Sequence, residues 1–187
     1  MIDLKNFKVG DILKNGTAIS IRAVRPDDKS RFAEAFRHLG PDAVYTRFFC
    51  CKKELTDEDL KIAVEVDFEN TVALVVTIPA GGGDETIIGA GRYILCGQPH
   101  ELRSAEIAFT VGENYQCQGI ASRILRHLIH IAQQKGVSQF EAEVLPKNRA
   151  MLAVFARSGL PMKELQEEGT VHVYLSLSAQ APWTAEP

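Results

Sequence analysis

One stretch in the middle of the chain constrains the fold more than any other, because a strand pattern, a long helix pattern and a second strand pattern follow one another there. From Gly119 to Lys135 apolar residues recur at intervals of three and four, which predicts an amphipathic helix that ends at Gly136. The flanking runs 103–112 and 138–145 read as strands. A strand, a helix and a strand in this order form a crossover that places the two strands parallel in one sheet.

The other predicted strands surround this parallel unit and favour antiparallel pairing. Residues 18–24 alternate between apolar and polar types, as a half-buried strand does. Residues 71–78 and 86–95 are rich in β-branched side chains and are joined by a glycine-rich turn, which predicts a hairpin. A last pair of strands is predicted at 162–166 and 170–177.

Four further helices are predicted from capping residues and apolar spacing. They begin at a cap on Asp27 or Asp28, at Asp42, near Asp57 behind a Thr56–Asp59 capping box, and at residue 147. We therefore predict an α/β (α+β) fold, with a mixed and mostly antiparallel sheet, a central βαβ unit and helices on both faces.

The chain length of 187 residues fits one domain better than two. We expect an N-terminal extension at 1–17 that packs on the domain, a folded domain at 18–177 and a loose tail at 178–187.

Composition excludes several classes of partner. The net charge of −3 gives no support for nucleic-acid binding. Cys50, Cys51, Cys96 and Cys117 have no metal-ligand spacing, so we expect reduced thiols and no metal site. No run approaches ~18 apolar residues, and no cationic segment precedes an apolar run at the start. We therefore expect a cytoplasmic protein without a membrane partner.

The clearest chemical signal lies in Val111–Ala121, where a strand passes through a short turn into the long helix. The first-turn N–H groups of a helix lack partners, and the helix dipole places positive charge at this end. Small residues at Gly119 and Ala121 let an anion approach the backbone, and a pyrophosphate is the natural occupant. Ser122 and Arg123 would add a hydroxyl and a charge. The turn has neither a GxGxxG nor a P-loop pattern, which excludes those two phosphate-binding motifs.

The pattern Gln116-x-x-Gly119-x-Ala121 resembles the acyl-CoA pyrophosphate loop of GCN5-related N-acetyltransferases, the GNAT family. Further along, Val144-Leu145-Pro146-x-Asn148 and Ser158-Gly159-Leu160 resemble the strand and helix that follow in that family. The resemblance covers residues 18–177 in element order. Within the family, the chain looks most similar to the GNAT domain of bacterial protein lysine acetyltransferases, on segments 22–28, 45–49 and 105–111.

The resemblance implies that acetyl-CoA is the co-substrate and that its acetyl group moves to a primary amine, most simply that of a protein lysine. It also implies that strands 103–112 and 138–145 splay apart, with the pantetheine arm along the first strand and the thioester in the gap. The backbone N–H near Val111 would then polarise the thioester carbonyl. The residues expected to contact acetyl-CoA are Phe109, Val111, Gln116, Cys117, Gln118, Gly119, Ile120, Ala121, Ser122, Asn148 and Phe155.

Glu106 is the candidate for the general base. A lysine amine has a pKa of ~10.4 and must lose a proton before it attacks near pH 7. Glu106 stands in an otherwise apolar strand, and the resemblance gives a glutamate at this position the role of base. The alternative is a surface glutamate that pairs with Arg92 across the strands. Glu141 and Glu143 compete for the role, but they alternate with apolar residues, as on a solvated strand face.

Two residues of the last predicted helix have expected roles. Asn148 is expected to cap the helix and, by resemblance, to touch the pantetheine. Phe155 stands where many members of the family have a tyrosine that protonates the departing thiolate. The thiolate therefore leaves unassisted, or Tyr115 or Tyr174 assists it.

Two alternatives to protein-lysine acetylation stay open. An acetyltransferase for a small amine would have a deep acidic acceptor pocket, whereas Arg47, Lys52 and Lys53 near the expected acceptor side favour an acidic protein surface. The second alternative is a non-catalytic module that binds acyl-CoA as a sensor. Phe155 keeps this alternative open and Glu106 argues against it; turnover discriminates between the two.

Overall fold

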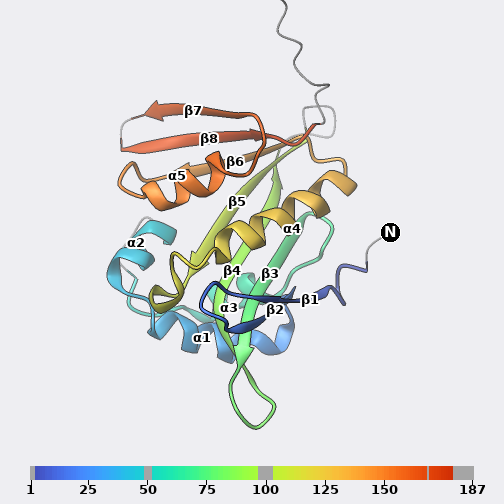
Figure 1. Ribbon diagram of the computed structural model, residues 1–187, viewed down its shortest axis with the longest axis vertical. Helices are drawn as coiled ribbons and strands as arrows, with labels where there is room; N and C mark the ends of the chain where they lie inside the picture. Colours follow the sequence, from blue (N-terminus) through green and yellow to red (C-terminus); the bar gives the residue numbers. More distant parts are fainter. Residues whose placement is uncertain (1–2, 49–51, 97–102, 168, 179–187) are drawn as a thin grey trace, which may run out of the picture.

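The computed structural model describes residues 3–48, 52–96, 103–167 and 169–178. Within them, one sheet of eight strands runs in the order β1-β2-β3-β4-β5-β6-β8-β7 (Figure 1). The strands are β1 (Lys8–Ile12), β2 (Ala18–Ala23), β3 (Thr71–Pro79), β4 (Glu85–Cys96), β5 (Ser104–Val111), β6 (Gln139–Val144), β7 (Met162–Glu167) and β8 (Thr170–Ser176). Among these strands only β5 and β6 pair in parallel, as far as the chain is described, which confirms the mixed sheet with a central βαβ unit.

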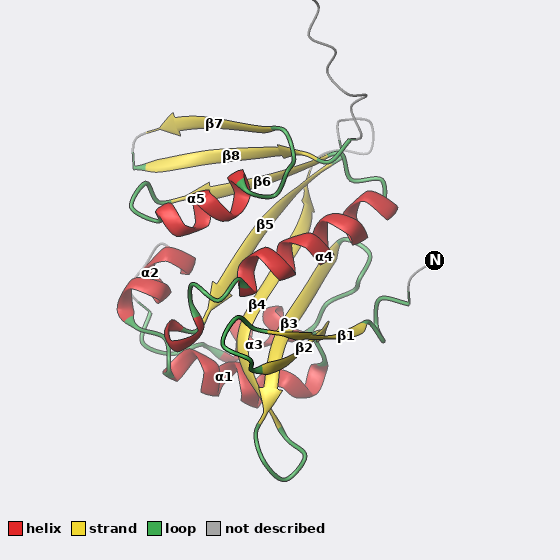
Figure 2. Cartoon of the chain, viewed as in Figure 1, coloured by secondary structure: helices red, strands yellow, loops and turns green. Residues whose placement is uncertain are grey.

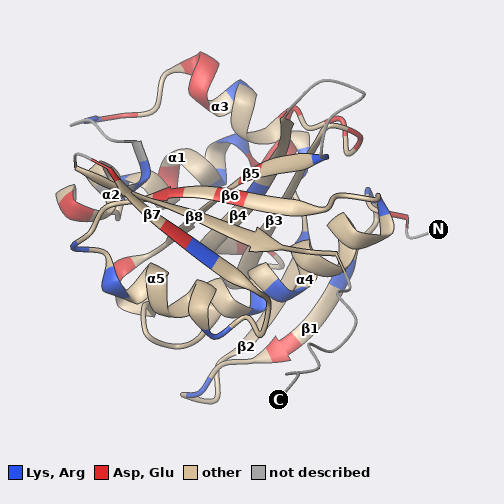
Figure 3. Ribbon diagram, turned by 90° about the horizontal axis from the view of Figure 1, so that it is seen from above, with Lys and Arg blue, Asp and Glu red and all other residues tan. Residues whose placement is uncertain are grey.

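Helices cover both faces of this sheet (Figure 2). The helices are α1 (Lys29–Arg37), α2 (Pro41–Phe48), α3 (Asp57–Val64), α4 (Ile120–Gln134) and α5 (Arg149–Ala156), with short 3-10 turns η1 (Pro26–Asp28) and η2 (Glu113–Tyr115). Seen from above, α4 and α5 lie on one side of the sheet and α1 and α3 on the other (Figure 3). The apolar stripe predicted for α4 is buried at Ile124, Leu125 and Leu128, so this helix anchors the core.

Capping explains where two of the helices begin. The Thr56 hydroxyl accepts a hydrogen bond from the Asp59 N–H at 3.2 Å, and the Asp59 carboxylate accepts one from the Thr56 N–H at 2.7 Å. This is the predicted capping box of α3. The Asn148 side chain accepts from the Met151 N–H at 3.2 Å and caps α5, as predicted.

The predicted side-chain cap at the start of α1 is wrong. Asp28 makes no capping hydrogen bond to α1. Instead its carboxylate receives two hydrogen bonds of 2.8 Å from the guanidinium of Arg22, which is 1% exposed. A buried guanidinium needs a countercharge, and the Asp28 carboxylate provides it through two charge-assisted hydrogen bonds. This pair therefore ties β2 to the start of α1.

The N-terminal extension belongs to the sheet rather than merely packing on it. Residues Lys8–Ile12 form β1 and pair antiparallel with β2, from Lys8 opposite Arg22 to Ile12 opposite Ala18. The strand is short, and its exposed and half-buried residues alternate without a fully buried position. Such a weak apolar pattern explains why the sequence shows no strand there. The predicted tail lies outside the described residues, apart from residue 178.

The parallel pairing of β5 with β6 is brief. It covers Ser104 with Gln139, Ala105 with Phe140 and Glu106 with Glu141, and no later pair forms in the described part of the chain. In contrast, β4 stays paired with β5 as far as Val111. The two parallel strands therefore part after Glu106, and Figure 1 shows them diverging.

Candidate active site

A cavity of about 790 Å³ lies where β5 and β6 part. Its walls are the end of β5, the loop that follows, the first turn of α4, one side of α5 and part of α2. The predicted acetyl-CoA contacts that line it are Phe109, Val111, Gln116, Cys117, Gly119, Ile120, Ala121, Ser122 and Asn148. The fold thus brings one continuous segment and one distant helix cap together around a single space.

Two predicted contacts do not line this cavity. Phe155 is 1% exposed and lies against Phe109, with ring centroids 6.1 Å apart. Phe155 therefore packs behind Phe109, whose side chain forms part of the cavity wall. Gln118 is half-buried, and its side-chain oxygen is buried without a hydrogen-bond partner among the described residues.

The loop before α4 adopts the left-handed backbone conformation at two residues, with φ of 60° at Cys117 and 83° at Gly119. Among the residues that the structure describes, no side chain caps the first turn of α4, so its N–H groups are open to a ligand. A Cβ at Gly119 would also approach within 2.6 Å of the Arg123 guanidinium. Gly119 is therefore needed both for its conformation and for the space that it leaves.

Arg123 holds this loop through the hydrogen bonds of its guanidinium. Its guanidinium donates to the Gln118 carbonyl at 3.1 Å, to the Asp11 carboxylate at 2.8 Å and to the Ile12 carbonyl at 2.9 Å. Hydrogen bonds from the Ile12 N–H and then from Arg123 hold the pKa of Asp11 below its ordinary value, although partial burial opposes this. The end of β1 thereby fastens the loop. Sequence reasoning missed Asp11 because nothing near it resembles a motif.

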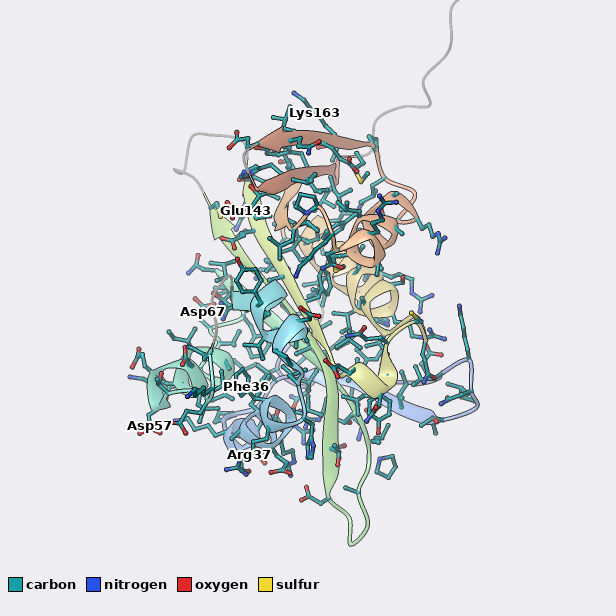
Figure 4. The ribbon with its side chains drawn as sticks, turned by 90° about the vertical axis from the view of Figure 1, so that its left-hand side faces the viewer. Phe36, Arg37, Asp57, Asp67, Glu143 and Lys163 are labelled. Atoms are coloured by element: carbon teal, nitrogen blue, oxygen red, sulfur yellow. The ribbon has the colours of Figure 1, made fainter. Side chains whose placement is uncertain are left out.

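A second cavity, of about 600 Å³, lies on the opposite side of β5, between the sheet and helices α1 and α3. Its walls include apolar side chains of both helices and the β5 residue Ala108. Figure 4 shows the side chains of this region, with Phe36 on α1 and Asp57 on α3 labelled. Both cavities are lined by Arg47, Thr110, Glu113 and Tyr115. The two spaces therefore meet at the end of β5.

Glu106 is exposed and lies on the face of β5 that carries Ala108 and Thr110. It belongs to the last registered pair before β5 and β6 part. Its side chain lines neither cavity, but Ala108, the next residue on the same face, lines the second one. The expected alternative, an ion pair with Arg92, is not formed among the described side chains; the attraction between the two acts over a longer distance.

Two arginines lie near Glu106. Burial, and then repulsion by Arg92, lowers the pKa of Arg47 to about 10, while the negative charge of Glu106 opposes the shift. Burial also lowers the pKa of Arg92, again against the attraction of Glu106. The three side chains therefore form one electrostatic group.

Two glutamates of β6 compete with Glu106, and two tyrosines are candidates for the acid. Glu141 accepts a hydrogen bond from Gln139 at 3.1 Å, and Glu143, labelled in Figure 4, lies 3.9 Å from His172. Neither glutamate lines a cavity. Tyr174 lies opposite Glu141 on β8, whereas Tyr115 lines both cavities. The position of Tyr115 therefore favours it over Tyr174 as the candidate for protonating the departing thiolate.

Among the described residues, no three His, Cys, Asp or Glu side chains are placed to hold a metal ion. In the same part of the chain, no helix is both long and apolar enough to cross a membrane.

Comparison with known proteins identifies the fold. The model of the acetyltransferase (GNAT) family matches residues 34–160. The chain belongs to this family. The GNAT domain of PAT from S. lividans superposes with a TM-score of 0.80 at 30% identity, covering 90% of this chain and 96% of that one. This likeness confirms the predicted GNAT fold.

Two curated relatives are also acetyltransferases by name. Acetyltransferase Pat of Mycolicibacterium smegmatis is 33% identical over 147 residues, which are 79% of this chain and 42% of that protein. Acetyltransferase PA5475 of Pseudomonas aeruginosa is 29% identical over 139 residues, which are 74% of this chain and 73% of that protein. The chain thus spans less than half of the length of the Pat relative.

Proposed function

We propose that this GNAT chain transfers an acetyl group from acetyl-CoA to a primary amine, that of a protein lysine. The observation that carries the proposal is the meeting of two cavities at the end of β5, directly after β5 and β6 part. The first cavity is lined by a loop and a helix N-terminus of the kind that binds phosphate groups. The other is open to a second substrate, and Glu106 lies one pleat from it.

The first cavity suits the donor. Phosphate groups bind at the free N–H groups of the first turn of α4, where the helix dipole also attracts negative charge. Lys14, Lys147 and Arg157 line the same cavity and add positive charge. Beyond Glu106, the β6-facing edge of β5 has no partner strand in the described part of the chain, so the pantetheine amides can pair with it. The thioester then lies where the two cavities meet.

The second cavity suits the acceptor. The amine nitrogen attacks the thioester carbon, the carbon–sulfur bond breaks and CoA leaves as a thiolate. Glu106 takes the proton of the amine, directly or through a water molecule, and the Val111 N–H stabilises the oxyanion. Tyr115 is our candidate for the group that protonates the thiolate, because it lines both cavities.

The walls of the second cavity argue against a polyamine acceptor. Arg47 and Arg92 line it, and their positive charges would repel a second ammonium group. The presence of Glu106 argues against a purely sensory module, because a sensor needs no base.

Thermal unfolding with acetyl-CoA tests the donor side. Ligand at ~100 times its dissociation constant adds about 2.7 kcal/mol to the free energy of unfolding. The melting temperature of a domain of this size should then rise by roughly 5–11 °C. A matched nucleotide without the pantetheine arm serves as the control and should give a smaller shift. No shift at millimolar acetyl-CoA would contradict the proposal.

A further inference from the structure

Arg92 is one of the charged residues that line the second cavity. It lies on β4, and its register partners on the neighbouring strands are Ala73 and Ala108. All three residues line the cavity, and the small alanine side chains leave the space beside the guanidinium open. Among the described residues, this guanidinium makes no hydrogen bond or ion pair. Because it carries five N–H donors and is partly buried, a bound anion would relieve an unfavourable state.

Arg47 brings a second guanidinium to the same cavity, from α2. The two cations repel each other, and both are attracted by Glu106. Glu34 of the cavity wall is engaged elsewhere, because it pairs with Arg37 on its own helix and with His38, the residue after it.

The other acidic residues of this wall do not neutralise Arg92 either. Asp59 binds Lys52 and the backbone of Thr56 in the α3 capping box. Glu113 is exposed and packs against Gly40, at the end of the cavity that joins the first one. The part of the cavity next to Arg92 is therefore suited to a negatively charged group.

Building on the proposed acetyl transfer, we propose that Arg92, with Arg47 beside it, binds a carboxylate of the acceptor, so that the preferred substrate is a lysine amine with an acidic group nearby. A guanidinium and a carboxylate form charge-assisted, bidentate hydrogen bonds. A neutral amide in the same place would leave the guanidinium only partly satisfied, which gives discrimination. The substrate carboxylate would also neutralise Arg92, so that Glu106 stays available for the amine proton.

Matched acceptors test this inference with the full chain and acetyl-CoA. One pair is Nα-acetyl-lysine and its methylamide, which differ only in the carboxylate. The other acceptors are peptides with a single lysine and either Asp or Asn at each of the three positions on both sides. We expect kcat/KM to favour the free carboxylate, and at least one Asp peptide over its Asn twin, by about tenfold or more. Equal values within every pair would overturn the inference.

Variants then assign the preference to a residue. Arg92→Gln should bring the Asp/Asn ratio toward one, and Arg92→Lys should restore part of it. The matched control is Arg37→Gln, which removes an exposed arginine of α1 outside both cavities and should keep the wild-type ratio. An unchanged ratio in Arg92→Gln, with both twins slowed equally, would overturn the inference. Absence of acetylation of every acceptor by the wild type would instead overturn the proposed function.

Discussion

The two cavities that meet at the end of β5 differ in the groups that they present to a ligand. The first includes the loop before α4, whose left-handed residues and uncapped first helical turn present backbone N–H groups, and its other walls come from α2 and α5. The second is formed by side chains from α1, α3, β3 and β4, together with Arg47 of α2 and residues of β5. Donor binding should therefore depend on backbone conformation and tolerate many side-chain changes. Acceptor binding and catalysis should depend on a few individual side chains.

The largest effect is expected at Glu106. Glu106→Gln removes the proposed base and should lower kcat by about 10²–10⁴-fold, while the dissociation constant of acetyl-CoA stays unchanged. Steady-state kinetics and calorimetric titration measure the two quantities. The control is Glu143→Gln, on the same face of the sheet but outside both cavities. If the control lost as much activity, the assignment of the base would be wrong.

A substitution in the loop should show the reverse pattern. Gly119→Ala places a Cβ at a left-handed residue, which costs roughly 1–2 kcal/mol, and crowds Arg123. We expect the dissociation constant of acetyl-CoA to rise at least about tenfold. Gly159→Ala is the matched control, because Gly159 also has a positive φ but no atom within 4 Å of an added Cβ. Equal losses of affinity in both variants would show that strain alone, and not the loop, is responsible.

The contact between β1 and the loop should have a smaller effect. Asp11→Asn weakens the charge-assisted hydrogen bond to Arg123, worth about 1 kcal/mol, so the affinity for acetyl-CoA should fall roughly fivefold. Asp3→Asn, in the same N-terminal segment but away from the loop, should have no effect. If the acceptor KM rose instead of the acetyl-CoA KM, β1 would not act through the loop.

The smallest effect concerns helix α3 in the wall of the second cavity. Hydrogen bonds from Lys52 and then from Thr56 lower the pKa of Asp59 to about 2. Because the folded pKa is lowered, Asp59 stabilises the fold above its unfolded pKa of ~3.9, and this contribution is lost as the pH falls toward 2.

Asp59→Asn should therefore lower the melting temperature by about 2–4 °C at pH 7 and by less near pH 2. It should also raise the acceptor KM without changing acetyl-CoA affinity. Calorimetric scans at both pH values, with Asp57→Asn as the control, measure this. A loss of stability that does not depend on pH would contradict the assignment to the ionised carboxylate.

The sequence predicts the donor side better than the acceptor side, for a physical reason. The strand, the turn glycine and the helix stripe of residues 103–135 are local patterns, and each confirmed element follows from a few neighbouring residues. The Thr56 and Asn148 caps are predictable for the same reason. Long-range contacts leave no such local pattern. The bond from Arg123 to Asp11 joins residues 112 apart, and the insertion of β8 between β6 and β7 depends on tertiary packing.

The second cavity could not be predicted either, because it also depends on contacts between residues far apart in the sequence. Arg47 and Arg92 come from α2 and β4, and no spacing in the sequence connects them. Asp28 could be predicted as a cap because its position fits, but its actual partner, Arg22, depends on how β2 meets α1.

The most direct test of the account follows both substrates in one reaction. The wild-type chain is incubated with acetyl-CoA and a lysine peptide, and the released CoA thiol and the peptide mass are measured together. We predict one acetyl group on the lysine amine for each thiol released. Thiol release without an acetylated peptide, or binding of acetyl-CoA with no turnover of any amine, would contradict the claim that the two cavities form one transfer site.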